Sequence, residues 1–356
     1  MMENKKEVTK RIEYIDVLKG FLILSVVMCH VGGFCMGIQE DIPSLHFILF
    51  EFRNPPFFFV SGFFAYKVGR TWNLNYSCSV IKKKFCMIFW PTTVFLSVLL
   101  YVHPSFHGHT FLHDNISDLW FHWFTYALFL FFIFYTCIKY LSYKIKCHST
   151  IEDCILLGCG LLCYLLFSIS SVYDHLPIST EWKDLFGLQY WGFFLFFVLG
   201  ALTKKHYTHF QNLLNNQVFI ALCLFVFFIL NIFWTPMMER HFNIFRITTY
   251  LTGIILVIYF FKYYHLPAFL NHFFLYTGRK TLDIYLIHYF FLPLALYYQT
   301  DFLRDTPLPI IEFFITVFLS VLIISMSLII SLVIRMNSLF TFFIFGEKQQ
   351  KPNNSL

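Results

Sequence analysis

The chain is poor in charge, because aspartate, glutamate, lysine and arginine make up only 13% of its 356 residues. A soluble domain of this size averages about 25% charged residues. Hydrophobic residues reach 58%, with 50 phenylalanines, and long apolar runs recur from one end of the chain to the other. This pattern predicts an integral membrane protein and leaves too few polar residues for a separate soluble domain. We expect one transmembrane domain over residues 1–346 and a short polar tail over residues 347–356.

The cysteines lack the spacings that are typical of zinc sites and disulfide frameworks. The ten cysteines include no Cys-x-x-Cys pair, and most lie in or beside apolar runs, where cysteine acts as a small hydrophobic residue. This argues against a disulfide framework and against a zinc site. Histidines occur at His103, His107, His109 and His113, but without a carboxylate or cysteine at a ligand spacing. We therefore expect no metal site.

The apolar runs predict an all-α fold with about ten membrane-crossing helices. The candidates are residues 15–35, 45–66, 85–102, 119–137, 154–172, 186–202, 218–234, 244–261, 282–298 and 310–334. Most of the 26 lysines and arginines fall on one side of this arrangement, and cytoplasmic loops are the ones enriched in basic residues. The chain is thus predicted to be a multi-pass protein of the cytoplasmic (inner) cell membrane, with both termini in the cytoplasm. Because the net charge of +6 follows the topology, it gives no support to nucleic-acid binding.

The first predicted crossing carries three ionisable residues, Asp16, Lys19 and His30. Such groups are costly in hydrocarbon, so they usually face a protein interior or a wet cavity and are functional. Lys19 and His30 lie close to three helical turns apart, on one face and about 16 Å from each other along the axis. Asp16 lies one turn before Lys19, at a spacing that lets the two side chains pair.

Three segments of the chain carry recognisable patterns. The first has Arg11, Asp16, Lys19-Gly20 and then His30, the second has Asn54-Pro-Pro, a phenylalanine run and Ser61-Gly62, and the third is Thr281-Leu-Asp283-Ile-Tyr285-Leu-Ile-His288. A basic stretch, Lys82-Lys83-Lys84, also leads to Pro91. In this order and spacing they resemble the membrane-bound acyltransferase family 3, including its members that O-acetylate sugars and polysaccharides. The resemblance spans nearly the whole chain.

The resemblance implies transfer of an acyl group, most often acetyl, from cytoplasmic acyl-coenzyme A to a hydroxyl of a sugar or glycan at the outer face. Acetyl-coenzyme A is then a cosubstrate, and no cofactor is expected to stay bound. A buried imidazole tends to stay neutral, so His30 is able to act as general base for attack on the thioester. It is equally able to take the acyl group itself and pass it on. The sequence leaves both routes open.

The remaining site residues follow from the same motifs. Lys19, with Lys82, Lys83 and Lys84, is expected to attract the phosphates of the coenzyme, and Asp16 to hold Lys19 in place. The alternative for the lysines is a purely topological role on the cytoplasmic side. His288 and Arg53 are expected to position donor or acceptor, although His288 is nearly as well explained by packing against a neighbouring helix. Ser61-Gly62 reads as a point of close helix packing.

A transporter or flippase for a glycan or a lipid-linked sugar is the rival function, because broken helices and intramembrane charges also suit transporters. No clear internal repeat relates the two halves of the chain, which counts against it. Rings lie beside carboxylates in Tyr173-Asp174-His175 and in Glu181-Trp182-Lys183-Asp184, as sugar-binding surfaces require, although an aromatic interfacial belt gives the same pattern. The sequence specifies neither the acceptor sugar nor the oligomeric state.

Overall fold

A computed structural model describes residues 12–37, 53–102, 122–232, 243–294, 296 and 308–346. Every element in these ranges is helical, in agreement with the predicted all-α class. The first half contains α1 (Glu13–His30), η1 (Val31–Cys35), α3 (Asn54–Ala65), α4 (Leu74–Lys84), η2 (Phe85–Phe89), α5 (Trp90–Val102), α6 (Trp123–Lys144) and α7 (Ser149–Phe167). The second half contains α8 (Ser170–Asp174), α9 (Thr180–Leu185), η5 (Leu188–Phe193), α10 (Phe194–Lys205), α11 (Tyr207–Asn215), α12 (Gln217–Ile232), α14 (Asn243–Tyr263), α15 (Ala268–Arg279), α16 (Thr281–Ile287), η6 (His288–Phe291), α18 (Pro309–Met336) and α19 (Ser338–Phe345).

Six helices in the described part of the chain are long and apolar enough to cross a membrane. A seventh results if α11 and α12, which are bent by 78° at their junction, form one span. These helices make the chain a multi-pass membrane protein. The count of about ten crossings and the cytoplasmic placement of the termini stay predictions, and the tail over 347–356 lies outside the described residues.

The difference in number comes from predicted crossings whose described helices are short or interrupted. Within 45–66 the helix α3 has 12 residues, and Pro55 and Pro56 occupy its first turn, where proline is tolerated. Within 186–202 the chain begins as the 3-10 turn η5 before it becomes α-helical in α10. Within 282–298 the seven-residue α16 passes into the 3-10 turn η6 and ends at Leu292, which is extended, as expected before Pro293.

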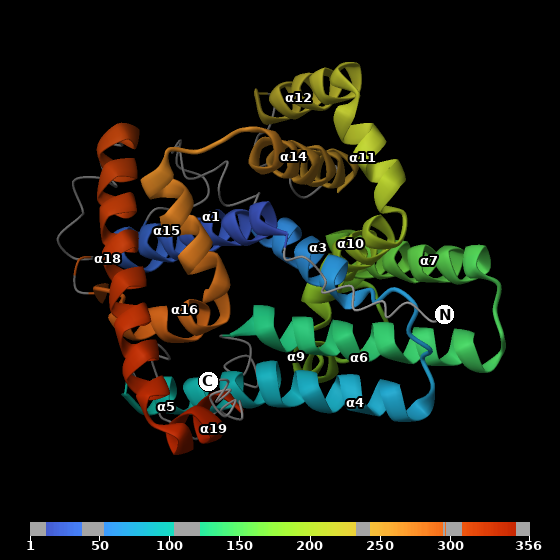
Figure 1. Cartoon of the computed structure of the whole chain (residues 1–356), viewed down its shortest axis with the longest axis horizontal. Coiled ribbons are helices and arrows are strands. Elements are labelled where there is room, and N and C mark those ends of the chain that lie inside the picture. The colour runs from blue at the N-terminus through green and yellow to red at the C-terminus, as the bar shows by residue number, and fades with distance from the viewer. Residues whose placement is uncertain are drawn as a thin grey trace, which may run out of the picture.

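The helices pack in two closely joined pairs (Figure 1), α1 with α15 and α3 with α10. The helices α4, α6 and α7 lie side by side next to them, and α18 flanks α1 and α16. The pair of α12 and α14 lies at the upper edge of the view in Figure 1. The short elements α3 and α16 therefore lie among longer helices, which cover them.

Glycine allows both pairs to approach at backbone distance. A Cβ atom added to Gly62 of α3 would meet the Phe197 carbonyl oxygen of α10 at 1.8 Å, and one added to Gly278 of α15 would meet the Asp16 carbonyl oxygen at 1.7 Å. No side chain fits at such distances, so Gly62 is confirmed as a point of close helix packing. Through Gly278 the same kind of contact fixes the turn of α1 that carries Asp16 and Lys19.

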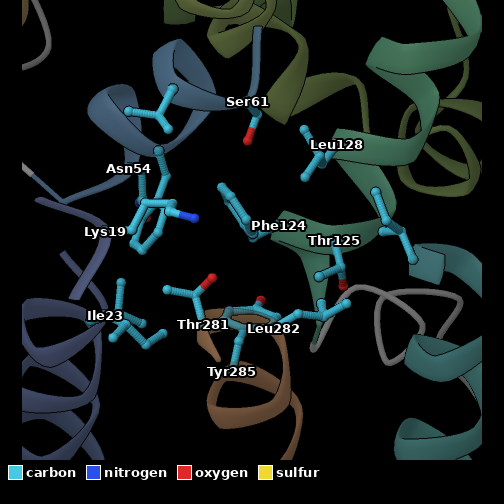
Figure 2. A pocket seen from close by; sticks show the side chains of 14 residues that line it. Lys19, Ile23, Asn54, Ser61, Phe124, Thr125, Leu128, Thr281, Leu282 and Tyr285 are labelled. Carbon is cyan, nitrogen blue, oxygen red and sulfur yellow. The ribbon is translucent and has the colours of Figure 1, made fainter. Parts of the chain in front are cut away.

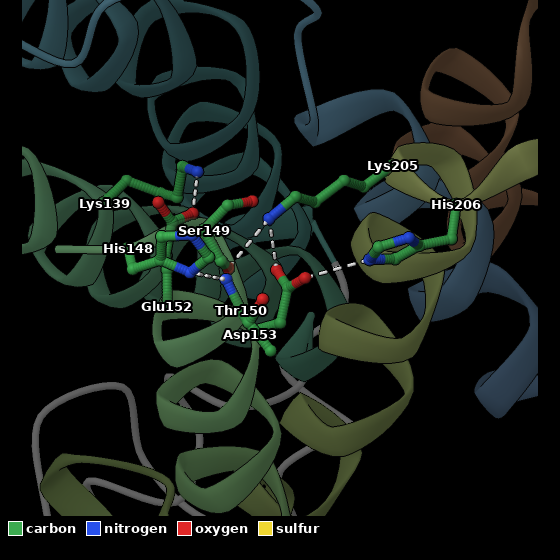
Figure 3. A network of polar contacts seen from close by, with 8 residues as sticks. All are labelled: Lys139, His148, Ser149, Thr150, Glu152, Asp153, Lys205 and His206. Carbon is green, nitrogen blue, oxygen red and sulfur yellow. Dashed lines mark hydrogen bonds and ion pairs between the residues drawn. The ribbon is translucent and has the colours of Figure 1, made fainter.

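Ion pairs join α6, α7 and α10 at one end of the bundle (Figure 3). Lys139 pairs with Glu152. Asp153 accepts from Lys205 Nζ at 2.5 Å and lies 2.9 Å from His206 Nε2. The carboxylates of α7 thus neutralise Lys139 and Lys205 and tie α7 to its two neighbours.

Replacing Gly62 with alanine is expected to destabilise the protein by about 1–3 kcal/mol, the usual cost of forcing a methyl group into a packed core. The thermal unfolding midpoint of the purified protein in detergent measures it. The matched control is Gly158→Ala in α7, where an added Cβ meets nothing within 4 Å. Equal midpoints for the two variants would contradict the close approach of α3 to α10.

Candidate functional site

A cluster of imidazole and phenol rings surrounds His30 at the end of α1. The His30 Nε2 atom lies 3.1 Å from the Tyr289 hydroxyl oxygen, a hydrogen-bond distance. The His288 ring stacks on the His30 ring with centroids 5.2 Å apart, and the His122 ring lies 5.1 Å from that of Tyr289. The fold thus brings His30 and His288, which are far apart in sequence, into one site.

The hydrogen bonds of His288 determine which of its ring nitrogens carries the proton. Its Nδ1 lies 3.1 Å from the carbonyl oxygen of Ile284 and 2.8 Å from that of Tyr285, and a carbonyl oxygen only accepts. The Nδ1–H group therefore donates, and Nε2 carries the lone pair of the neutral ring. That Nε2 atom is buried and makes no hydrogen bond to any described residue. His288 thus presents an oriented acceptor atom beside His30.

Exposure separates the three imidazoles of the cluster. His122 and His288 are fully buried, whereas His30 is partly exposed. Arg53, which caps the start of α3, lies close enough for its charge to act on both His30 and Tyr289. His30 is therefore the imidazole of this cluster that a substrate can reach, and a guanidinium lies near it.

A cavity of about 160 Å³ lies beside Lys19 (Figure 2). Figure 2 shows the Lys19 ammonium turned toward the cavity, whose walls come from α1, α3, η2, α6 and α16. Its α1 wall extends from Lys19 to Val26, about two helical turns, and His30 follows one turn later. At the far wall Tyr285 lies 5.9 Å, between ring centroids, from His288. The cavity therefore extends from the charged turn of α1 to Tyr285, which lies beside His288.

The charged turn of α1 is held by two contacts of Asp16. Asp16 is 3% exposed, and its Oδ1 lies 2.7 Å from Lys19 Nζ. Its Oδ2 lies 3.9 Å from Arg279 Nε at the end of α15. Asp16 thus touches Lys19, as its spacing suggests, and both residues lie on the turns of α1 that precede the site of His30.

Lysines from three segments gather at the end of α3 and form what we call the basic cluster: Lys67, Lys83, Lys84 and Lys204. Partial burial and the charges of Lys83 and Lys204 lower the pKa of the Lys67 ammonium, which places these three groups near one another. No carboxylate among the described residues pairs with a member of the basic cluster. This differs from Lys139 and Lys205, which α7 neutralises.

The basic cluster borders the cavity. The Lys84 ammonium lies 3.8 Å from the centroid of the Phe132 ring. Lys84 precedes Ile88, and Phe132 follows Leu128, by about one helical turn, and both Ile88 and Leu128 line the cavity. On the α3 side, Lys204 lies over the Phe63 ring at 4.9 Å from its centroid. Of the predicted lysines, Lys19, Lys83 and Lys84 thus belong to this region, while Lys82, which like Lys83 is exposed, lies on the same last turn of α4 and is not a member of the basic cluster.

A buried ion pair fixes α16, the helix that leads to His288. Asp283 accepts from Arg335 Nη2 at 2.9 Å and from Arg335 Nε at 3.0 Å, a two-point contact with α18. Ser331 donates a further hydrogen bond of 2.5 Å to the same carboxylate. Asp283 is 4% exposed, so the pair replaces water as the partner of its charge.

Several residues of the site were not singled out by the sequence analysis. Tyr289 and His122 lie outside the motifs considered, although the position of Tyr289 beside His288 was a signal for it. Lys67 and Lys204 were counted only as basic loop residues, because no local pattern links two lysines so far apart. Among the described residues, no group of histidine, cysteine, aspartate or glutamate side chains has the geometry to hold a metal ion.

Replacing Asp283 with alanine is expected to cost about 3–5 kcal/mol of stability, because it removes the two-point carboxylate contact of the partly buried Arg335. The thermal unfolding midpoint measures the loss, with Lys280→Ala as control. Lys280 lies 3.8 Å from the same carboxylate and is partly exposed, so its removal should change little. Equal losses from both variants would contradict the dominant role of Arg335.

A family model described as an acyltransferase domain matches residues 12–335. The match contains the cavity, the ring cluster around His30 and the basic cluster. Comparison with curated proteins and with solved structures found no match. Because the family model covers nearly the whole chain, the chain belongs to acyltransferase family 3 and is a multi-pass membrane acyltransferase.

Proposed function

We propose that the protein moves an acyl group, with acetyl as the first candidate, from acyl-coenzyme A on the cytoplasmic side to a hydroxyl of a sugar or glycan at the outer face. The observation that carries the proposal is the cavity whose lining includes Lys19, Val26 and Tyr285, the last of which lies beside His288. It borders both a region rich in positive charge and the rings next to the imidazoles, and a phosphate-bearing thioester donor needs cations and an imidazole.

The size of the cavity supports a donor whose thioester arm enters the cavity while its nucleotide stays outside. About 160 Å³ is below the ~300–1,000 Å³ of pockets that enclose a whole drug-sized ligand. It suits the thin thioester arm of the coenzyme and leaves the bulky nucleotide outside. The basic cluster lies where the nucleotide phosphates would then be, with Lys19 at the entrance. Lysine binds phosphate as a point charge, whereas arginine makes two parallel hydrogen bonds to it. Phosphate binding by the lysines of the basic cluster would therefore depend more on charge than on hydrogen-bond geometry.

His30 is the proposed general base. Its imidazole takes the proton of the acceptor hydroxyl as the hydroxyl oxygen attacks the thioester carbonyl carbon. The carbon–sulfur bond breaks, the acyl group stays on the sugar oxygen, and the departing thiolate recovers a proton from the imidazolium. In the alternative route His30 attacks first and carries the acyl group to the hydroxyl in a second step. Tyr289 orients His30 on either route, while Arg53 and the His288 Nε2 atom position the reacting groups.

Replacing His30 with alanine is expected to lower transfer about 10²–10⁴-fold, the usual contribution of general acid–base catalysis. The measurement is transfer of label from radiolabelled acetyl-coenzyme A to extracted surface glycans in membranes of matched expression. Tyr289→Phe, which keeps the ring and removes the hydroxyl, should reduce kcat by less because His30 remains.

The matched control for His30 is His272→Ala, since His272 is exposed on α15 and bonds only to the Ala268 carbonyl within its own helix. It should transfer at the wild-type rate. Label that reaches glycan at the same rate without the His30 imidazole would overturn the assignment. Absence of transfer by the wild type with every donor and acceptor tried, together with movement of glycan across the membrane, would favour the flippase function instead.

Removing one lysine of the basic cluster, as in Lys84→Ala or Lys204→Ala, is expected to raise KM for acetyl-coenzyme A about tenfold with kcat little changed. A hydrogen bond to a charged group contributes about 1.5–3 kcal/mol, and 1.4 kcal/mol is a factor of ten. Titration of initial rates against the donor at low and high salt measures the effect, which should shrink as salt screens the charges.

Acetyl-pantetheine, a donor without the nucleotide phosphates, provides the internal control. Wild type and lysine variants should use it equally, because the lysines then have no phosphate to bind. The matched variant is Lys144→Ala, which removes an exposed charge at the end of α6 and should leave both donors unaffected. A loss with acetyl-pantetheine as large as with acetyl-coenzyme A would show that the lysines support the fold and do not bind the donor.

A further inference from the structure

A second cavity lies where α7, η5, α10 and α14 meet, apart from the cavity of the donor. It measures about 390 Å³, which falls within the ~300–1,000 Å³ of small-ligand pockets. Its lining includes the rings of Tyr190, Phe193 and Tyr250 and the polar side chains of Ser168, Gln189 and Arg246. A concave wall of rings with a few convergent polar groups is the usual form of a specific ligand site.

Three ring-bearing residues, Trp123, His122 and Tyr289, connect the cavity lining to His30. The Tyr190 ring stacks on Trp123, with centroids 4.3 Å apart and planes 13° from parallel. Trp123 directly follows His122, whose ring packs on Tyr289, the hydrogen-bond partner of His30. A ligand in this cavity would therefore be separated from His30 by these rings and would leave the residues of the reacting centre in place.

The ends of the elements around the cavity agree with an acceptor that arrives from outside. The cavity is built from the last turn of α7 and the first turns of α10 and α14. With the predicted cytoplasmic N-terminus, these ends face the outer side, as does the His30 end of α1. Asp184 of α9 lies close enough to act electrostatically on Tyr190 and brings a carboxylate to the same region.

We propose that this cavity, which we call the acceptor pocket, binds a pyranose ring of the acceptor glycan that is remote from the unit whose hydroxyl reacts at His30. The proposal rests on the proposed function. Aromatic rings offer flat apolar faces to the C–H face of a sugar, and Gln189 and Arg246 offer donors to its hydroxyl or carboxylate oxygens. Binding of a sugar unit remote from the reaction holds the reacting hydroxyl in place, which is how remote binding energy promotes catalysis.

Cysteine labelling tests occupancy without requiring transfer. In the Gln189→Cys variant of the full chain, a membrane-impermeant maleimide reports access to the pocket, because Gln189 is exposed and lines it. The wild-type chain gives the background from the ten native cysteines. Methyl glucoside, N-acetylglucosamine and glucuronate are the probes, and at least one is expected to slow labelling several-fold. Sorbitol, which has the hydroxyls but no ring face, should not.

Two matched variants separate occupancy from indirect effects. The Leu185→Cys variant places a thiol at a nearby exposed position outside the pocket, so sugars should not change its labelling. Adding Arg246→Ala to Gln189→Cys should weaken the protection several-fold. Equal effects of sugars and sorbitol, equal effects at both thiols, protection that persists unchanged without Arg246, or no labelling through Gln189→Cys would each overturn the acceptor pocket.

The same labelling in His30→Ala membranes keeps this proposal apart from the proposed function. Protection should persist there, because His30 is not part of the pocket lining. Protection together with a wild type that transfers no acyl group would leave the pocket standing and remove the acyltransferase mechanism. Transfer by the wild type without protection by any of the three sugars would remove the pocket and leave the mechanism.

Discussion

The rise of a single helix sets the distance over which the proposed reaction works. Lys19 and His30 both belong to α1, and eleven residues at 1.5 Å each separate them by about 16 Å. A donor held by its phosphates near Lys19 must therefore extend a long, thin arm to reach His30. The cavity follows α1, because its lining includes Lys19, Ile23 and Val26, the last of which lies one turn before His30. Since α15 contacts the backbone of α1 at Gly278, this spacing is held from outside as well.

Ion pairs within the bundle allow the charged side chains of Asp16 and Asp283 to stay buried. A carboxylate or an ammonium in hydrocarbon is costly, so each needs a partner or access to water. Asp16 has Lys19 and Arg279, and Asp283 has Arg335 and Ser331. Both aspartates join neighbouring helices while they neutralise charge. The basic cluster differs, since among the described residues no carboxylate pairs with it, and the proposed function gives these lysines the donor phosphates as partners.

The residues of α1 illustrate how much of the site is predictable from sequence. A helical period determines that Asp16 meets Lys19 and that His30 lies on the same face, and both follow from spacing alone. The partners of His30 do not follow from spacing, because Tyr289 and His288 reach it only through the packing of distant helices. The apolar runs likewise predicted helices but not their continuity. Runs such as 282–298 are hydrophobic enough to cross a membrane, yet Pro293 and the 3-10 turn at His288 interrupt the helix there.

Those interruptions explain where the site lies. Non-helical backbone at membrane depth is tolerated only where protein buries it or a polar cavity receives it. The proline-initiated start of α3 brings Arg53 toward His30, and the end of α16 places His288 and Tyr289 against it. A continuous helix in either place would direct these side chains around the axis at 100° intervals and would leave no common point for them. Broken helices therefore concentrate several polar side chains in one place. In the proposed function this is the place where the donor and the acceptor hydroxyl meet at the partly exposed His30.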